Sequence, residues 1–423
     1  MRKRYVITRM EIRGREYLIY TEFDDRGKLQ EISASPADQD ELLGNIYIGK
    51  VKDIAASIDA AFVEIAPGRR CFLSCSGLRQ PLFTKKIGKK LICQDEELVV
   101  QVVRDAVKTK IPEVSGDLQL EGQYLVLTAG NHKLGVSNKL PSDVSMRLRE
   151  AFLNGIKAIP GAAEELGRDY GCILRTNAER VPIDQVILEY EKLREQYLEI
   201  VHTAPHRTAY SLIRKAKPFY LKELEGIPYE EEAQIVTDCP DIYETILQQQ
   251  RFLPDMDRAA SGSDDHSAAE RPCCRVSLYQ DDYPLSKLYS LEKQIEDACR
   301  ERVWLKSGAY LVITPTEALT VIDVNSGKQN KGKDSKENYR KINLEAADEI
   351  ARQLRIRNIS GICVVDFINL DTKEAQAELM QHFRRALSAD RVPVHLVDIT
   401  KLGLVELTRK KVKRSLIEQL KNS

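Results

Sequence analysis

Two aspartates in the last third of the chain have the surroundings expected of metal ligands. Asp323 lies in ALTVIDVNSG and Asp366 lies in GICVVDFINL, each inside a run of apolar, mostly β-branched residues. Alternate residues of a strand face the same way, so Asp323 shares its face with the amide of Asn325. A buried carboxylate without a partner is costly, and two adjacent ones repel unless a proton or a cation lies between them. These two acids therefore need a compensating charge.

A divalent cation would supply that charge. Oxygen ligands without histidine or cysteine suit Mg²⁺ or Mn²⁺, and such a cation could activate water at a phosphoryl centre. The alternative is an ordinary salt bridge to Arg352, Arg355 or Arg357. When Asp366 is considered by itself, a salt bridge is the favoured interpretation. When the two acids are considered together, metal-assisted chemistry is favoured. The lysines of GKQNKGKD (327–334) could equally contact the substrate or only solvent.

The sequence around these acids predicts how the fold brings them together. Residues 309–325 read as a hairpin with the turn TPTE, residues 343–358 as a helix, and residues 361–370 as a buried strand. A strand, a helical crossover and a second strand indicate parallel pairing, which places the two acids on neighbouring strands. A helix at 372–390 and a strand at 392–399 extend this α/β pattern.

The first quarter of the chain predicts a small β-barrel. Residues 44–77 contain short β-rich runs with glycine turns, and residues 96–107 read as the closing strand. Phe62 and Phe72 are candidate platforms for nucleic-acid bases, each worth roughly 1–3 kcal/mol if a base stacks on it. Basic residues flank them: Lys50, Arg69, Arg70 and Lys110. From the residues alone, two core phenylalanines are the commoner outcome.

A third candidate site follows the apolar strand in GCILRTNAER. Arg175 and Thr176 could hold a phosphate through guanidinium and hydroxyl donors, although a surface arginine is the commoner outcome. Residues 142–156 read as a helix capped by Ser142, and residues 183–204 read as a long amphipathic helix.

Composition limits the class of protein. The chain has 423 residues, 43% of them hydrophobic, and equal numbers of basic and acidic residues, 64 each. No apolar run approaches the ~20 residues of a membrane span, and the basic start lacks the features of a signal peptide, so we expect a cytoplasmic protein without a membrane partner. Nine scattered cysteines suggest reduced thiols rather than a disulfide framework. Residues 255–272 read as a flexible insert.

Several of these stretches together resemble the ribonuclease E/G family of bacterial endoribonucleases. The resemblance is strongest in TEALTVIDVNSGK (316–328), NLEAADEIARQLRIRNISGICVVDFINL (343–370) and GLVELTRKK (403–411), and it continues in GNIYIGKV, AAFVEI, QYLVL and ILRT. It implies a mixed α/β chain of several subdomains. These are an RNase H-like part made of residues 1–38 and 217–274, an OB-type RNA-binding barrel at 39–117, a 5′-end sensor at 118–216, and a DNase I-like catalytic subdomain at 275–423.

The same resemblance implies roles for particular residues. Asp323 and Asp366 would hold the catalytic Mg²⁺, and Asn325 would support the metal site or the scissile phosphate. The other implied roles are the grip on a 5′-monophosphate by Arg175 and Thr176 with the backbone of Val126, and contact with single-stranded RNA by Phe62, Phe72 and Lys110.

Two departures from the family pattern modify these expectations. The cysteine pair of the family's inter-subunit zinc link should follow GLVELTRKK, but KVKRSLIEQLKNS stands there, so we expect no zinc and a monomer or weak dimer. Asn138 stands where the family tends to carry an extra basic residue, which favours weaker 5′-end sensing.

The sequence therefore predicts a metal-dependent endoribonuclease that acts on single-stranded RNA in rRNA and tRNA processing and in mRNA decay. It would leave 5′-phosphate and 3′-hydroxyl ends and be stimulated by a 5′-monophosphate. An RNA-binding module of the same fold without catalysis is the alternative, and a hydrolase of DNA or of small phosphoesters is a third possibility.

Overall fold

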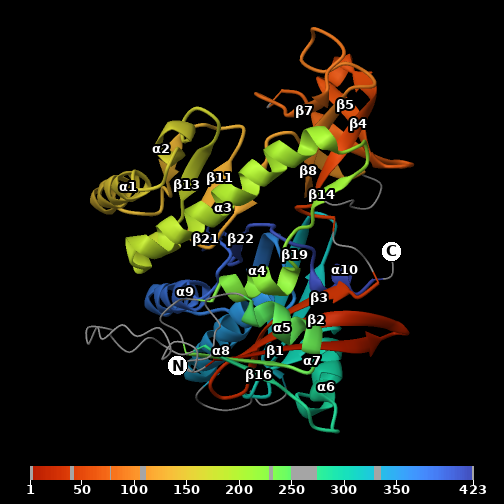
Figure 1. Cartoon of the computed structure of the whole chain (residues 1–423). Coiled ribbons are helices and arrows are strands. Elements are labelled where there is room, and N and C mark those ends of the chain that lie inside the picture. Colours follow the sequence, from red (N-terminus) through yellow and green to blue (C-terminus); the bar gives the residue numbers. More distant parts are fainter. Residues whose placement is uncertain are drawn as a thin grey trace, which may run out of the picture. The chain divides into compact units, whose positions relative to one another are not determined.

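The computed structural model describes residues 3–38, 42–76, 78–104, 111–227, 232–248, 274–327 and 335–421. The chain divides into two compact units, which we call the split unit (1–39 and 230–423) and the inserted unit (40–229). The described residues form four β-sheets with helices packed on them, so the fold is mixed α/β, as the sequence predicts (Figure 1). Lys110, the lysine loop after Gly327 and the predicted insert at 255–272 lie outside the described residues.

Distant segments of the split unit build a five-stranded sheet, in the order β16-β15-β1-β2-β3. Three consecutive strands form an antiparallel meander, β15 adds to β1 in parallel, and β16 adds to β15 in parallel. The strands are β1 (Lys3–Ile12), β2 (Arg15–Phe23), β3 (Leu29–Pro36), β15 (Ala233–Thr237) and β16 (Arg275–Leu278). The helices that follow β15 and β16 are α5 (Pro240–Leu247), α6 (Leu285–Leu288) and α7 (Leu291–Cys299).

The second sheet of the split unit has six strands, in the order β17-β18-β19-β20-β22-β21. They are β17 (Arg302–Trp304), β18 (Tyr310–Pro315), β19 (Leu319–Asn325), β20 (Gly361–Asp366), β22 (Val405–Arg409) and β21 (Val394–Ile399). The predicted hairpin is β18–β19, and the predicted parallel pair is β19–β20, joined by α8 (Ser335–Ile356). Buried residues of α8 and of α9 (Lys373–Leu387) share one hydrophobic core with Ile322 and Val365.

Three details of this sheet differ from the sequence prediction. The strand predicted to be buried at 361–370 ends at Asp366 and is buried on one face only, through Cys363 and Val365. The crossover helix begins at Ser335, eight residues before the predicted start. The unpredicted strand β22 lies between β20 and β21 and is antiparallel to both, because a short turn after β21 reverses the chain.

Ion pairs join the two sheets of the split unit. Glu22 of β2, whose side chain is 7% exposed, accepts from Lys3 at 2.9 Å and from Arg391 at 2.7 Å. Glu31 of β3 pairs with Lys413 at 3.0 Å. Burial opposes ionisation of Glu31, but the positive charges of Lys413 and Arg391 hold the pKa of its carboxyl below the usual range. The six-stranded sheet is therefore anchored to the five-stranded one by charges at low exposure. The short helix α10 (Leu416–Gln419) packs on β3.

The inserted unit begins with a closed five-stranded barrel, β4-β5-β6-β9-β8, in which β8 returns to pair with β4. These strands are β4 (Ile46–Ala55), β5 (Ala60–Ala66), β6 (Arg69–Ser74), β8 (Glu97–Arg104) and β9 (Glu113–Ser115), with β7 (Phe83–Lys85), β14 (Leu212–Arg214) and the 3₁₀ turn η1 (Ala56–Ile58) beside them. The predicted closing strand is confirmed. Cys71 is fully buried in the barrel, and burial raises the pKa of its thiol to about 11, so it serves as a small apolar residue.

The rest of the inserted unit is a four-stranded sheet, β10-β11-β13-β12, with helices packed on it. Its strands are β10 (Gln119–Glu121), β11 (Leu125–Thr128), β12 (Leu134–Val136) and β13 (Gly171–Leu174). Its helices are α1 (Ser142–Ile156), α2 (Ala162–Glu165) and α3 (Ile183–Thr203), with 3₁₀ turns η2 (Thr176–Arg180) and η3 (Ala204–His206). Helix α4 (Phe219–Glu225) follows β14 in the chain.

The two predicted helices of this region are confirmed as α1 and α3, but the predicted cap is wrong. Pro141 occupies the N-cap position of α1, and no side chain caps that end, because Ser142 is already the first helical residue. In the described part of the chain, no helix is both long enough and apolar enough to cross a membrane.

Candidate functional sites

The two aspartates lie side by side on the open face of the six-stranded sheet. β19 and β20 run parallel with Asp323 directly opposite Asp366. Ile322 and Val324 are buried beneath the helices, so the residues between and after them, Asp323 and Asn325, face the opposite side, as the alternation predicts. Asp323 is half-buried and Asp366 is exposed. The structure therefore brings the two carboxylates together at the carboxyl ends of two parallel strands, where open α/β sheets place reactive groups.

An amide orients one of the two acids. Nδ2 of Asn325 donates a hydrogen bond of 2.7 Å to Oδ2 of Asp323. Asn325 lies two residues beyond Asp323 on the same strand and the same face, so the bond needs no other element. This contact orients the Asp323 carboxylate, and no hydrogen bond from the described residues reaches its second oxygen.

The salt-bridge alternative for the acids is not what the structure shows. Arg352 bonds to Glu349 and to the carbonyl oxygen of Leu29. Arg355 donates to Gln30 at 2.9 Å and Arg357 to Gln353 at 2.6 Å. Within the described ranges, no ion pair involves Asp323 or Asp366, so no described cation balances their charge.

Two carboxylates and an amide fit a magnesium site that water and substrate complete better than a site whose ligands all come from the protein. The described residues contain no cluster of three or more His, Cys, Asp or Glu side chains that could hold a metal. Mg²⁺ is commonly held by one or two carboxylates, with water and substrate phosphate oxygens completing its coordination. Asp323 and Asp366 match this donor set.

The two barrel phenylalanines face outward rather than into the core. Phe62 of β5 is directly opposite Phe72 of β6, and their rings meet edge to face with centroids 6.3 Å apart. Both are half-buried, whereas Val63 and Leu73, the residues that follow each of them, are inside the barrel. The interpretation of both rings as core is therefore wrong, and the pair offers aromatic surface to a ligand.

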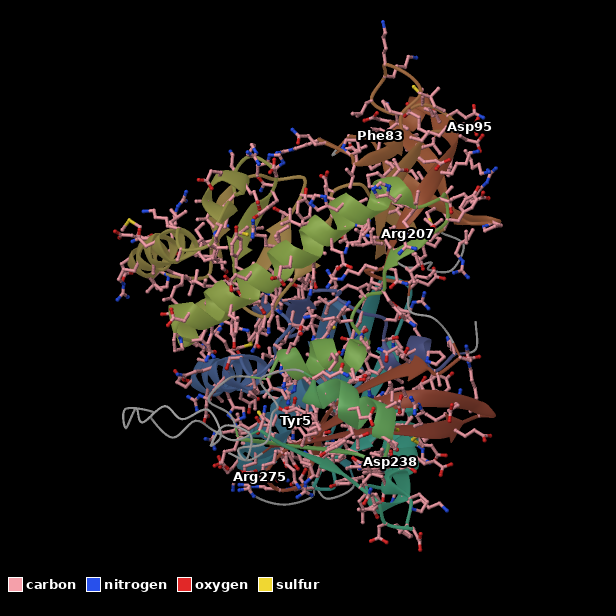
Figure 2. All side chains as sticks on the ribbon, viewed as in Figure 1. Tyr5, Phe83, Asp95, Arg207, Asp238 and Arg275 are labelled. Carbon is pink, nitrogen blue, oxygen red and sulfur yellow. The ribbon has the colours of Figure 1, made fainter. Side chains whose placement is uncertain are left out.

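The basic residues around this pair are mostly engaged. Lys50 pairs with Asp95 at 3.1 Å, and Arg70 pairs with Asp53 at 3.0 Å. Figure 2 shows Asp95 on the barrel, as well as Phe83 of β7. Arg69 is exposed, and Lys110 lies outside the described residues. The barrel surface thus carries mixed charge rather than a uniform positive field.

Arg175 and Thr176 are held at a corner of the four-stranded sheet. Nη1 of Arg175 donates to the carbonyl oxygen of Gly122 at 2.7 Å, and the Thr176 hydroxyl lies 3.0 Å from that of Ser137. Val126 of β11 is directly opposite Ile173 of β13, two residues before Arg175. The structure brings the three residues of this predicted site into one region of the sheet.

Sequence reasoning missed the residues that build this corner. Glu189 of α3 accepts hydrogen bonds from the backbone N–H groups of Gln123 at 2.6 Å, Tyr124 at 2.7 Å and Leu125 at 3.1 Å. A Cβ added to Gly122 would lie 2.5 Å from the Glu189 carboxyl group, so a larger residue here would displace that carboxylate from its backbone bonds. We call Gly122, Ser137, Arg175, Thr176 and Glu189 the arginine corner. In the sequence, Glu189 looks like one more polar residue on an amphipathic helix, so no local signal marks it.

Comparisons with known proteins identify similar sequences in one family. The sequence model of the ribonuclease E/G family matches residues 119–412. Ribonuclease E of Synechocystis sp. is 32% identical over 396 residues, which cover 93% of this chain and 55% of that protein. Ribonuclease G of Salmonella typhimurium is 30% identical over 410 residues, or 94% of this chain and 78% of that protein. Ribonuclease E of Escherichia coli is 30% identical over 402 residues, which are 36% of its length. The chain thus spans about half the length of the cyanobacterial relative.

Proposed function

Because the chain belongs to the ribonuclease E/G family, we propose that it is a metal-dependent endoribonuclease that cleaves single-stranded RNA to 5′-phosphate and 3′-hydroxyl ends. The observation that carries the proposal is the pairing of Asp323 with Asp366 on an open sheet face, with no described cation beside them. The RNAs would be precursors of rRNA and tRNA, and mRNA undergoing decay.

The chain's own residues would place the reacting phosphate at these acids. Asp323 and Asp366 would hold Mg²⁺, or Mn²⁺ in its place, and no zinc. The bound cation would supply Lewis-acid chemistry and an activated water. Asn325 keeps the Asp323 carboxylate in one orientation through its 2.7 Å bond. Because Asp366 is exposed, a phosphodiester of a flexible single strand can approach it without displacing protein atoms.

The other sites would bind the rest of the RNA. Phe62 and Phe72 would stack on bases and Lys110 would contact the strand, with the barrel at 39–117 acting as an OB-type module. We further propose that the five-stranded sheet, built from both 1–38 and 217–274 with β16 added, is an RNase H-like part, and that residues 275–423 are a DNase I-like catalytic subdomain.

The arginine corner would sense the 5′ end within residues 118–216. A guanidinium has five N–H donors, and Gly122 accepts one from Arg175, so others stay available for a 5′-monophosphate. The Thr176 hydroxyl and the backbone of Val126 would complete the grip. With Asn138 uncharged, we expect stimulation by a 5′-monophosphate to be modest. A cytoplasmic location and a monomer or weak dimer stay predictions.

A cleavage assay tests the proposal. The parent chain and the variants Asp323→Asn and Asp366→Asn are incubated with a single-stranded RNA, with Mg²⁺ or with a chelator, and the product ends are mapped. Glu317→Gln is the matched control, because Glu317 is an exposed acid in the turn at the far end of the same hairpin. We expect cleavage by the parent and the control, with Mg²⁺ only.

Each other result has a defined meaning. Cleavage that persists in both aspartate variants would contradict the catalytic assignment. A parent that binds RNA without cutting it would be a binding module of the same fold. Cleavage of duplex DNA or of a phosphomonoester with RNA left intact would identify a different hydrolase.

A further inference from the structure

The open face of the six-stranded sheet carries an aromatic pair beside an arginine. Trp304 of β17 is directly opposite Tyr310 of β18, and their ring centroids are 5.2 Å apart. Cζ of Arg302 lies 4.6 Å from the centroid of the Tyr310 ring and 5.8 Å from that of Trp304. Trp304 is 64% exposed, an unusual state for so large an apolar side chain.

The strand register connects this group to the aspartates. Tyr310 is directly opposite Asn325, so Trp304, Tyr310 and Asn325 form one row across three neighbouring strands. Val312 lies opposite Arg302 on one side and Asp323 on the other, and the same row ends at Asp366. Neighbouring strands are ~4.8 Å apart, so the Tyr310 backbone lies one strand spacing from that of Asn325. The Trp304 backbone lies two strand spacings from Asn325.

Packing does not account for the aromatic pair. The core beneath this edge of the sheet is formed from the opposite face, by Leu311 and Ile313 with Val303 packed against them. Within the described ranges, Arg302 forms no ion pair, and its guanidinium lies over the two rings. Exposed aromatic surface beside functional polar groups marks a ligand site, and aromatic rings combined with arginine are what single-stranded nucleic acids bind.

We propose that Trp304 and Tyr310 stack on a base of the single-stranded RNA next to the phosphate held at Asp323 and Asp366, and that Arg302 contacts a neighbouring backbone phosphate. This inference rests on the proposed ribonuclease function and adds a subsite to it. Stacking tolerates every base, so the subsite positions the strand and reads little sequence. Trp304 and Tyr310 are positioning residues, because they do not touch the reacting atoms.

Trp304 is the only tryptophan of the chain, so its fluorescence reports on this subsite alone. The full chain is titrated in chelator, which prevents turnover, with a single-stranded RNA or with inorganic polyphosphate of the same charge. We expect saturable quenching by RNA and little by polyphosphate, because only RNA carries bases. Equal responses to both, or no response to RNA, would overturn the proposal.

Variants separate stacking from a general effect on the fold. Trp304→Leu keeps apolar bulk but removes the aromatic face, and we expect it to raise KM for RNA cleavage about tenfold with kcat nearly unchanged. Trp304→Phe should recover most of the affinity. Met146→Ala is the control, since Met146 is 67% exposed on α1, and it should behave as the parent.

The outcomes distinguish the two proposals. Quenching by RNA without any cleavage would support the subsite and contradict the nuclease. Cleavage without quenching, and with parental KM in Trp304→Leu, would contradict the subsite and leave the nuclease standing. Quenching that depends on protein concentration instead of RNA would identify a protein interface and overturn the subsite.

Discussion

Asp323 and Asp366 receive one side-chain hydrogen bond from the described residues, from Asn325, whereas Arg175 and Thr176 are both bonded to groups that are themselves held in place. Glu189 fixes the turn after Gly122, and Gly122 in turn accepts from Arg175. The acids are thus accessible to a cation, because few of the described groups contact them. In the arginine corner, protein groups hold both side chains, so the orientation of Arg175 and the local stability depend on the same bonds.

The barrel contains a carboxylate that is held by protein groups even more fully than the side chains of the arginine corner. Glu96 is fully buried and accepts from the backbone N–H groups of Ile87 and Gly88 at 3.0 Å and of Cys93 at 2.8 Å, as well as from Lys86 at 2.9 Å. Burial alone would raise its pKa, but these donors lower it to about 2. A carboxylate with this many donors has a structural role, which makes the sparse surroundings of Asp323 and Asp366 more informative.

The largest expected effect comes from neutralising Asp366 of the acid pair. Asp366→Asn should lower kcat roughly a thousandfold, because several kcal/mol of metal-dependent stabilisation are lost. The same change should leave the free energy of unfolding unchanged or raise it by up to ~1 kcal/mol, since repulsion from Asp323 is relieved. RNA cleavage kinetics and urea unfolding without metal measure the two effects. A variant that lost stability along with activity would show that Asp366 is structural.

The next effect comes from the arginine corner. Glu189→Gln turns an acceptor into a donor that faces backbone N–H groups, so we expect a loss of up to ~3 kcal/mol in the free energy of unfolding. It should also abolish the preference for 5′-monophosphorylated over 5′-hydroxyl RNA, because the turn that positions Arg175 is released. Glu195→Gln, at an exposed position of the same helix, is the control. Equal rates on the two RNAs in the parent would contradict a role of Arg175 in sensing.

A pH-dependent effect is expected for the barrel. The pKa of Glu96 is about 2 in the folded chain and ~4.3 when unfolded, so its ionisation stabilises the fold above pH ~4.3, and this contribution is lost as the pH falls towards 2. Glu96→Gln should cost ~1–2 kcal/mol at neutral pH and little near pH 2. Unfolding followed by circular dichroism across this range measures the difference. A penalty that stays constant with pH would mean that Glu96 does not act through its charge.

The smallest effect is expected at the hydroxyl pair of the arginine corner. Thr176→Val removes the bond to Ser137 and should reduce the modest 5′-monophosphate preference by roughly threefold at most, as expected for a single weak hydrogen bond. Thr208→Val is the control, because it removes a similar Thr–Ser contact, to Ser211 at 3.3 Å, elsewhere in the same unit. If both variants behaved alike, the hydroxyl of Thr176 would have no specific role at the 5′ end.

Local patterns in the sequence were sufficient for part of this fold. The alternation in ALTVIDVNSG predicts the face shared by Asp323 and Asn325, and a strand, crossover and strand predict parallel pairing with β20. The β-rich runs of 44–77 and 96–107 predict the closed barrel. Local patterns are not sufficient where the structure depends on segments that are distant in the chain. The open face of β20, the position of β22 between β20 and β21, and the outward direction of Phe62 and Phe72 are not local properties.

The sequence by itself determined which residue types stand at the acid site and on which face of their strand, because the period of a strand is a local property of the chain. Tertiary structure alone decided that Asp323 is directly opposite Asp366, that Trp304 and Tyr310 lie in the adjoining row with Asn325, and that Glu189 reaches the turn after Gly122. Register between strands, and the reach of a helix side chain across a core, are set by packing between segments far apart in the chain.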